Sequence, residues 1–138
     1  MSNAITLIKH ADLVESVAAA LQYISYYHPA DFIAHLARAY EREQGPAAKD
    51  AMAQILTNSR MCAEGHRPIC QDTGIINVFL KIGLDVRFEG FPGSVEDAVN
   101  EGVRRAYLNS DNPLRGSILD DPSSSARTPR TTHPPSST

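Results

Sequence analysis

A short segment in the middle of the chain carries four different polar groups in consecutive positions. Cys70, Gln71, Asp72 and Thr73 supply a thiol, an amide, a carboxylate and a hydroxyl. Pro68 precedes them and disfavours helix at the position before it. A hydrophobic core has no use for such a run, whereas a short, stiff loop bearing these groups is typical of a binding or catalytic site.

The residues alone leave three roles open for Cys70. A cysteine is often buried and then packs as a small apolar residue. Together with Cys62 and His66 it forms a C-x3-H-x3-C pattern that could bind zinc, but this spacing is not a standard structural zinc framework and a fourth ligand is not evident. The third role is that of a thiolate, acting as a metal ligand or a nucleophile.

Composition places the chain among soluble globular proteins. Its 138 residues are 42% hydrophobic and 21% charged, with a net charge of −3, which allows one domain or part of a larger one. An acidic balance argues against nucleic-acid binding. No apolar run approaches the ~20 residues that span a bilayer, and the N-terminus lacks a secretory signal, so we expect a cytoplasmic protein. Two cysteines make no disulfide framework.

The first sixty residues show apolar side chains at helical spacing. Asp12 and Glu15 form a capping-box pattern that predicts the start of one helix. Pro29 marks the start of a second helix and Pro46 the start of a third, which is expected to fade over residues 62–65. The N-terminal half of the chain is therefore predicted to be helical.

The apolar period changes from helical to strict alternation after the Cys70 segment. Every even position from residue 76 to residue 88 is apolar, which predicts a half-buried β hairpin or bent strand with Gly83 at a turn or bulge. Ser94 with Asp97 then opens a further helix. The predicted fold class is α+β.

The segment R-P-I-C-Q-D-T-G resembles the first cysteine motif of the class I fumarate hydratases and of the related two-subunit tartrate dehydratases. The likeness extends to D-L-V-E-S-V-A-A-A-L-Q-Y-I-S-Y-Y-H-P, A-Q-I-L-T-N-S-R-M-C-A-E-G-H and N-E-G-V-R-R-A-Y-L, and covers roughly residues 5–121. The resemblance implies an α/β N-terminal region of an iron–sulfur-dependent hydro-lyase. Its reaction would be the reversible hydration of fumarate to malate.

The resemblance also implies roles for individual residues. In that family three cysteines hold a [4Fe–4S] cluster with one iron open to substrate, and Cys70 takes the place of one of them. Gln71 and Asp72 match positions that line the pocket for the C4 dicarboxylate, although Asp72 could equally be structural. Arg115 matches an arginine that grips a substrate carboxylate, for which a guanidinium is suited. Cys62 matches no cluster position and is predicted to be a core residue.

The remaining polar residues receive structural assignments. His66 could polarise the pocket, but a hydrogen-bonded structural histidine is the preferred interpretation, and Arg104 and Arg105 are expected to form a solvated helix face. The resemblance places the other two cluster cysteines and the catalytic acid/base later in the family's chain, so no catalytic residue is assigned here and this chain alone is predicted to be inactive. A full-length member is expected to be a homodimer. The alternatives are the alpha subunit of a two-chain tartrate or fumarate dehydratase, and a small helical metal-binding module.

Residues 122–138 differ in character from the body of the chain, residues 1–121. Thirteen of these seventeen residues are Pro, Ser or Thr and none is a large apolar residue, which predicts a disordered tail. A sharper interpretation is a reading-frame error. The family's chain continues with R-K-N-T-x-D-N-T-P-A-V-I-H. Possible codons for residues 125–138 encode this segment in a shifted frame, in which each new codon consists of the third base of one codon and the first two bases of the next.

Overall fold

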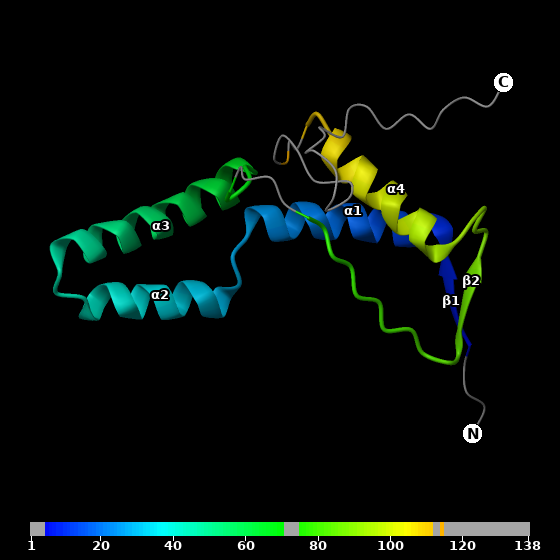
Figure 1. The fold of residues 1–138 in the computed structure, drawn as a ribbon, viewed down its shortest axis with the longest axis horizontal. Coiled ribbons are helices and arrows are strands. Elements are labelled where there is room, and N and C mark those ends of the chain that lie inside the picture. Colours follow the sequence, from blue (N-terminus) through cyan, green and yellow to red (C-terminus); the bar gives the residue numbers. More distant parts are fainter. Residues whose placement is uncertain (1–4, 71–74, 112–113, 115–138) are drawn as a thin grey trace.

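The structure is a computed structural model that describes residues 5–70, 75–111 and 114 (Figure 1). Along the chain its elements are β1 (Thr6–Lys9), α1 (His10–Tyr26), α2 (Ala30–Arg42), α3 (Pro46–Gly65), β2 (Val86–Glu89) and α4 (Val95–Leu108). This mixed, mostly helical arrangement confirms the predicted fold class. Within the described part of the chain, no helix is long and apolar enough to cross a membrane.

The helices α1 and α4 pack along each other and form the body of the structure (Figure 1). Val14 on α1 and Ala98 on α4 are completely buried, and Ala106 nearly so. Gly102 allows the closest approach, because a Cβ added there would lie 2.7 Å from Val17 Cβ and 2.8 Å from the Val14 carbonyl oxygen. The face of α4 that packs on α1 is thus formed by small and β-branched residues, namely Ala98, Val99, Gly102 and Ala106.

Replacing Gly102 by alanine is therefore expected to loosen the α1–α4 pair. The methyl group can fit only if the helices separate, and overpacking of this kind costs about 1–3 kcal/mol. The measurement is hydrogen exchange of the α1 and α4 amides, which should lose protection. Gly83→Ala serves as the control, because the nearest atom to its added Cβ, Val86 Cγ2, is 3.9 Å away. Equal protection in both variants would contradict the close helix contact.

The capping box predicted for α4 is present in the structure, and the one predicted for α1 is absent. The capping box of α4 is present, with the Ser94 hydroxyl accepting from the Asp97 N–H and the Asp97 carboxylate accepting from the Ser94 N–H. The hydrogen bonds that the Asp97 carboxylate accepts, first from the Ser94 N–H and then from the Ser94 hydroxyl, lower the pKa of Asp97. The capping box predicted at Asp12 is wrong. Because β1 runs directly into α1, the helix begins at His10, and Lys9 caps it without a side-chain hydrogen bond.

The long helical hairpin α2–α3 extends away from the α1–α4 body (Figure 1). Pro29 is the N-cap of α2, one residue before its first turn, and Pro46 is the first residue of α3, as predicted. The His28 ring stacks on Phe32 with centroids 4.6 Å apart, and its Nδ1 lies 3.0 Å from the Ser59 hydroxyl of α3. These contacts join the start of α2 to the end of α3.

Strand β2 pairs with a strand that the sequence did not indicate as its partner. β2 pairs in parallel with β1, in a register that sets Thr6 opposite Val86 and Lys9 opposite Glu89. Of the two forms expected for residues 76–88, the hairpin is therefore not formed. Only the last part of this segment pairs, and the even-numbered Leu80, Ile82 and Leu84 are 48%, 50% and 95% exposed. The prediction of a half-buried element is wrong for the unpaired part, because alternation indicates which side chains share a face but not whether that face is covered.

Candidate functional site

The described part of the predicted site centres on Cys70, whose side chain is exposed. Gln71, Asp72 and Arg115 lie outside the described residues. Leu114, which precedes Arg115 in the sequence, is only 8% exposed and packs in a cluster with Tyr26 of α1 and Ala106 of α4.

The residues that lead to Cys70 leave α3 through a sharp turn at His66. His66 adopts the left-handed conformation, with φ 47° and ψ 54°, and is the cap of the helix. Its N–H and that of Arg67 both donate to the Cys62 carbonyl, the latter at 3.1 Å. We call residues 66–70 the Cys70 loop; it turns back from α3 toward the end of α1.

The His66 ring is held by two tyrosines at the end of α1. It stacks on the Tyr26 ring with centroids 5.6 Å apart, and its Nε2 lies 3.2 Å from the Tyr27 hydroxyl. The hydrogen bond predicted for His66 is thus present. The Tyr26 hydroxyl is buried and has no hydrogen-bond partner among the described residues, and burial raises the pKa of this phenol.

Cys62 is buried on α3, as predicted for a core residue. Its thiol lies 3.5 Å from the Pro68 carbonyl oxygen and 3.5 Å from Asn58 Oδ1, and its single hydrogen can be donated to either of them. The C-x3-H-x3-C pattern is thus not assembled as a zinc site. Across residues 5–70, 75–111 and 114, no group of three His, Cys, Asp or Glu side chains could hold a metal ion.

Ile69, the residue before Cys70, is tied to two helices through its backbone. Its N–H donates to the Ser25 carbonyl on α1 at 2.9 Å, and its carbonyl accepts from Asn58 Nδ2 on α3 at 3.2 Å. Sequence reasoning missed both partners. The signal for Asn58 was its spacing, because it lies one helical turn before Cys62 and therefore on the same face of α3.

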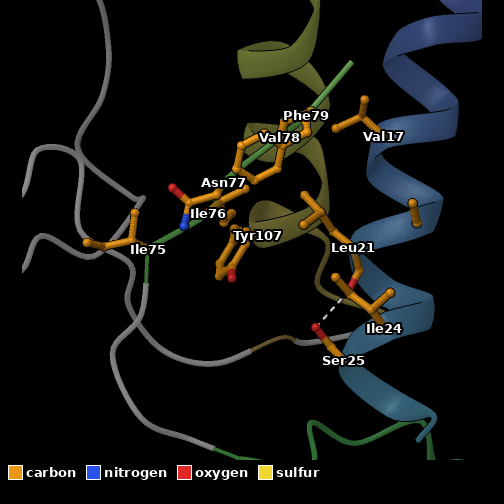
Figure 2. A pocket seen from close by; sticks show the side chains of 11 residues that line it. Val17, Leu21, Ile24, Ser25, Ile75, Ile76, Asn77, Val78, Phe79 and Tyr107 are labelled. Atoms are coloured by element: carbon orange, nitrogen blue, oxygen red, sulfur yellow. Dashed lines mark hydrogen bonds between the residues drawn. The ribbon is translucent and has the colours of Figure 1, made fainter. Parts of the chain in front are cut away.

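An apolar groove of about 480 Å³ lies between α1, the segment 75–79 and Tyr107 of α4. In Figure 2 the side chains of Val17, Leu21 and Ile24 on α1 face this segment across the groove. Ser25 lines it too, with its hydroxyl donating to the Leu21 carbonyl at 2.7 Å. The walls are mostly apolar, so these residues alone do not form a site for a dicarboxylate.

Arg104 and Arg105 form the solvated face predicted for them. Both donate to the Glu101 carboxylate at 2.7 Å, from the third and fourth positions after it on α4. The hydrogen bonds from Arg104 and then Arg105 lower the pKa of Glu101 to about 2. Both arginine side chains are thus paired with a carboxylate on the surface of α4.

Comparisons with known proteins agree on one family. The family model described as "Fumarate hydratase (Fumerase)" matches residues 14–137. A protein of Methanocaldococcus jannaschii, described provisionally as L(+)-tartrate dehydratase subunit alpha, is 33% identical over 93 residues. That alignment covers 67% of this chain and 32% of the relative, so the chain spans about a third of the length of this curated relative.

Proposed function

This chain belongs to the fumarate hydratase family, and we propose that it is the N-terminal part of an iron–sulfur-dependent hydro-lyase that converts fumarate reversibly to malate. The observation that carries the proposal is the family match over residues 14–137 together with an exposed Cys70 in the segment R-P-I-C-Q-D-T-G. The test is an anaerobic comparison of kcat/KM for fumarate, mesaconate and tartrate. Fumarate is expected to give the highest value, and a preference for tartrate would overturn the choice of substrate.

The residues present fit one ligand position of a [4Fe–4S] cluster. The Cys70 side chain is exposed at the end of a loop held by two helices, and a cysteine sulfur is the usual protein ligand of such a cluster. Cys62 does not fit, because it is buried with its thiol directed at the Pro68 carbonyl. When bound, the cluster supplies a Lewis-acidic iron that polarises the substrate. The two further ligands would come from outside these 138 residues.

Three residues of this chain are proposed to bind the substrate. The Gln71 amide would donate to a carboxylate of the substrate, and the Asp72 carboxylate would accept from the hydroxyl of malate. Arg115 would bind one substrate carboxylate through two parallel N–H groups. The general acid/base that moves the proton is proposed to lie beyond this chain. The chain alone is therefore expected to hydrate no fumarate.

A second candidate function is that of the alpha subunit of a two-chain dehydratase. The observation that favours it is the description of the relative as the alpha subunit of a tartrate dehydratase. The remaining ligands would then reside on a companion protein rather than later in one chain. Co-purification with a second protein, in place of the homodimer that we propose for the full-length form, would favour this candidate.

We further propose that residues after about Pro122 are translated out of frame. The support is the codon regrouping described above, in which a dozen consecutive positions are compatible with the family's continuation; the family match, which runs to residue 137 of the chain as given, does not support it. We call the product read in the corrected frame the full-length enzyme.

Arg115→Lys in the full-length enzyme is expected to lower kcat/KM for fumarate at least tenfold, about 1.4 kcal/mol. Lysine keeps the positive charge but loses the planar pair of donors that matches a carboxylate. Steady-state kinetics under anaerobic conditions measure the change. Arg104→Lys is the matched control, because Arg104 pairs with Glu101 on the surface of α4 and should leave the kinetics unchanged. Unchanged kinetics in the Arg115 variant would exclude its role in carboxylate binding.

A further inference from the structure

We propose that Asn58 is a positioning residue for Cys70. Its side chain reaches from α3 to the backbone of the Cys70 loop, where Nδ2 donates to the Ile69 carbonyl at 3.2 Å. The inference deepens the proposed function and rests on it, since Cys70 is the residue proposed as cluster ligand. Asn58 is not proposed to touch the cluster or the substrate, and acts through the direction that it gives to the chain at Cys70.

The contact with the Ile69 carbonyl sets the orientation of the Asn58 amide. The Cys62 thiol can donate a hydrogen bond and lies 3.5 Å from Asn58 Oδ1. The Ile69 carbonyl can only accept and faces Nδ2. A flipped amide would place oxygen against the carbonyl and lose the donor. The Ile69 carbonyl therefore fixes the amide with Nδ2 toward the loop, and the Cys62 thiol, which can donate or accept, is compatible with this orientation.

Cys62 adds a second contact between α3 and the same loop. Its thiol also lies 3.5 Å from the Pro68 carbonyl oxygen, so two consecutive carbonyl groups, those of Pro68 and Ile69, face donors from one helix. The buried cysteine thus takes part in holding the exposed one.

The end of α1 holds the other side of the loop. The Ile69 N–H donates to the Ser25 carbonyl at 2.9 Å, so both backbone polar atoms of Ile69 are paired, each with a different helix. The N–H and the carbonyl of Ile69 belong to consecutive peptide planes, so both planes are held, and the second of them leads into Cys70. A ligand that is already oriented loses less freedom when the metal binds, and groups that orient ligands tune the affinity of metal sites.

Because Asn58 is exposed, its positioning role can be tested without a large change in the stability of the protein. The residue is exposed on α3 and belongs to no apolar cluster, so its loss should not unfold the helix. An exposed hydrogen bond contributes little to global stability but can still fix a local conformation. Asn58→Asp is the informative variant, because it keeps the shape and the acceptor while it replaces the donor by an oxygen.

The first experiment uses the 138-residue chain and residue-resolved hydrogen exchange. Asn58→Asp is expected to speed exchange of the Ile69 amide about fivefold or more, while helicity stays unchanged. Asn100→Asp, on the exposed surface of α4, is the matched control and should leave Ile69 exchange as it is. Equal exchange rates at Ile69 in all three proteins would overturn the proposal.

The second experiment uses the full-length enzyme and the electron paramagnetic resonance signal of the reduced cluster. Asn58→Asp is expected to change the signal and to speed cluster loss in air about fivefold, with an unchanged melting temperature. An unaltered signal with wild-type lability would refute the positioning role. A wild-type enzyme that holds no cluster would refute the proposed function instead, and the exchange experiment would still decide whether Asn58 fixes the loop.

Discussion

Cys70→Ser in the full-length enzyme is expected to abolish both the [4Fe–4S] cluster and the hydration of fumarate. A serine hydroxyl stays protonated near neutral pH and is a poor ligand for iron, whereas a thiolate is the usual one. Since Cys70 is exposed, the substitution should cost little stability. Iron and sulfide content, visible absorbance and malate formation, all measured anaerobically, report the loss.

Cys62→Ser is the control for this variant. Cys62 is 5% exposed and its thiol donates toward the Pro68 carbonyl, so serine loses packing but keeps a donor. The expected cost is about 1–2 kcal/mol in the free energy of unfolding, with the cluster retained. Equal loss of the cluster in the two variants would contradict the assignment of Cys70 as the ligand and Cys62 as a structural residue.

The features that could be predicted from sequence are those set by neighbouring residues. Ser94 and Asp97 form a capping box within one helical turn, and Pro46 fits a first-turn position whatever surrounds it. Pairing of β2 with β1 could not be predicted in this way, because the strands are about eighty residues apart and neither carries a marker for the other.

The same limit applies to the site. The thiol of Cys70 was identified from its local motif, and its exposure agrees with a role outside the core. The groups that hold it, Asn58 and the Ser25 carbonyl, come from two helices whose packing brings them to Ile69. A backbone carbonyl has no sequence signature, and an asparagine on a helix face is most often solvated. Only the fold distinguishes this asparagine from the others.

Correcting the reading frame is expected to turn an inactive chain into an active enzyme. The coding DNA should show a one-base insertion or deletion near codons 121–125, followed by an open frame that continues the family's sequence. The regrouped codons allow few residues at each position, because their second and third bases are nearly fixed. Compatibility over a dozen positions is therefore hard to attribute to a true Pro/Ser/Thr-rich tail.

The gain of activity has its own control. The 138-residue chain should hydrate no fumarate, since it has one proposed cluster ligand in Cys70 and none of the proposed acid/base groups. The frame-corrected product should hydrate fumarate, and a corrected gene with Cys70→Ser should not. A shifted frame that meets a stop codon within the expected segment, or spells a different one, would refute the frame error.

Malate formation from fumarate by the anaerobically purified full-length enzyme, before and after exposure to air, tests most directly whether this chain belongs to an iron–sulfur hydro-lyase acting on fumarate. We expect rapid malate formation before exposure, and loss of activity together with the visible absorbance of the cluster afterwards. Activity that survives in air in a colourless protein, or no malate from an intact cluster enzyme, would contradict this function.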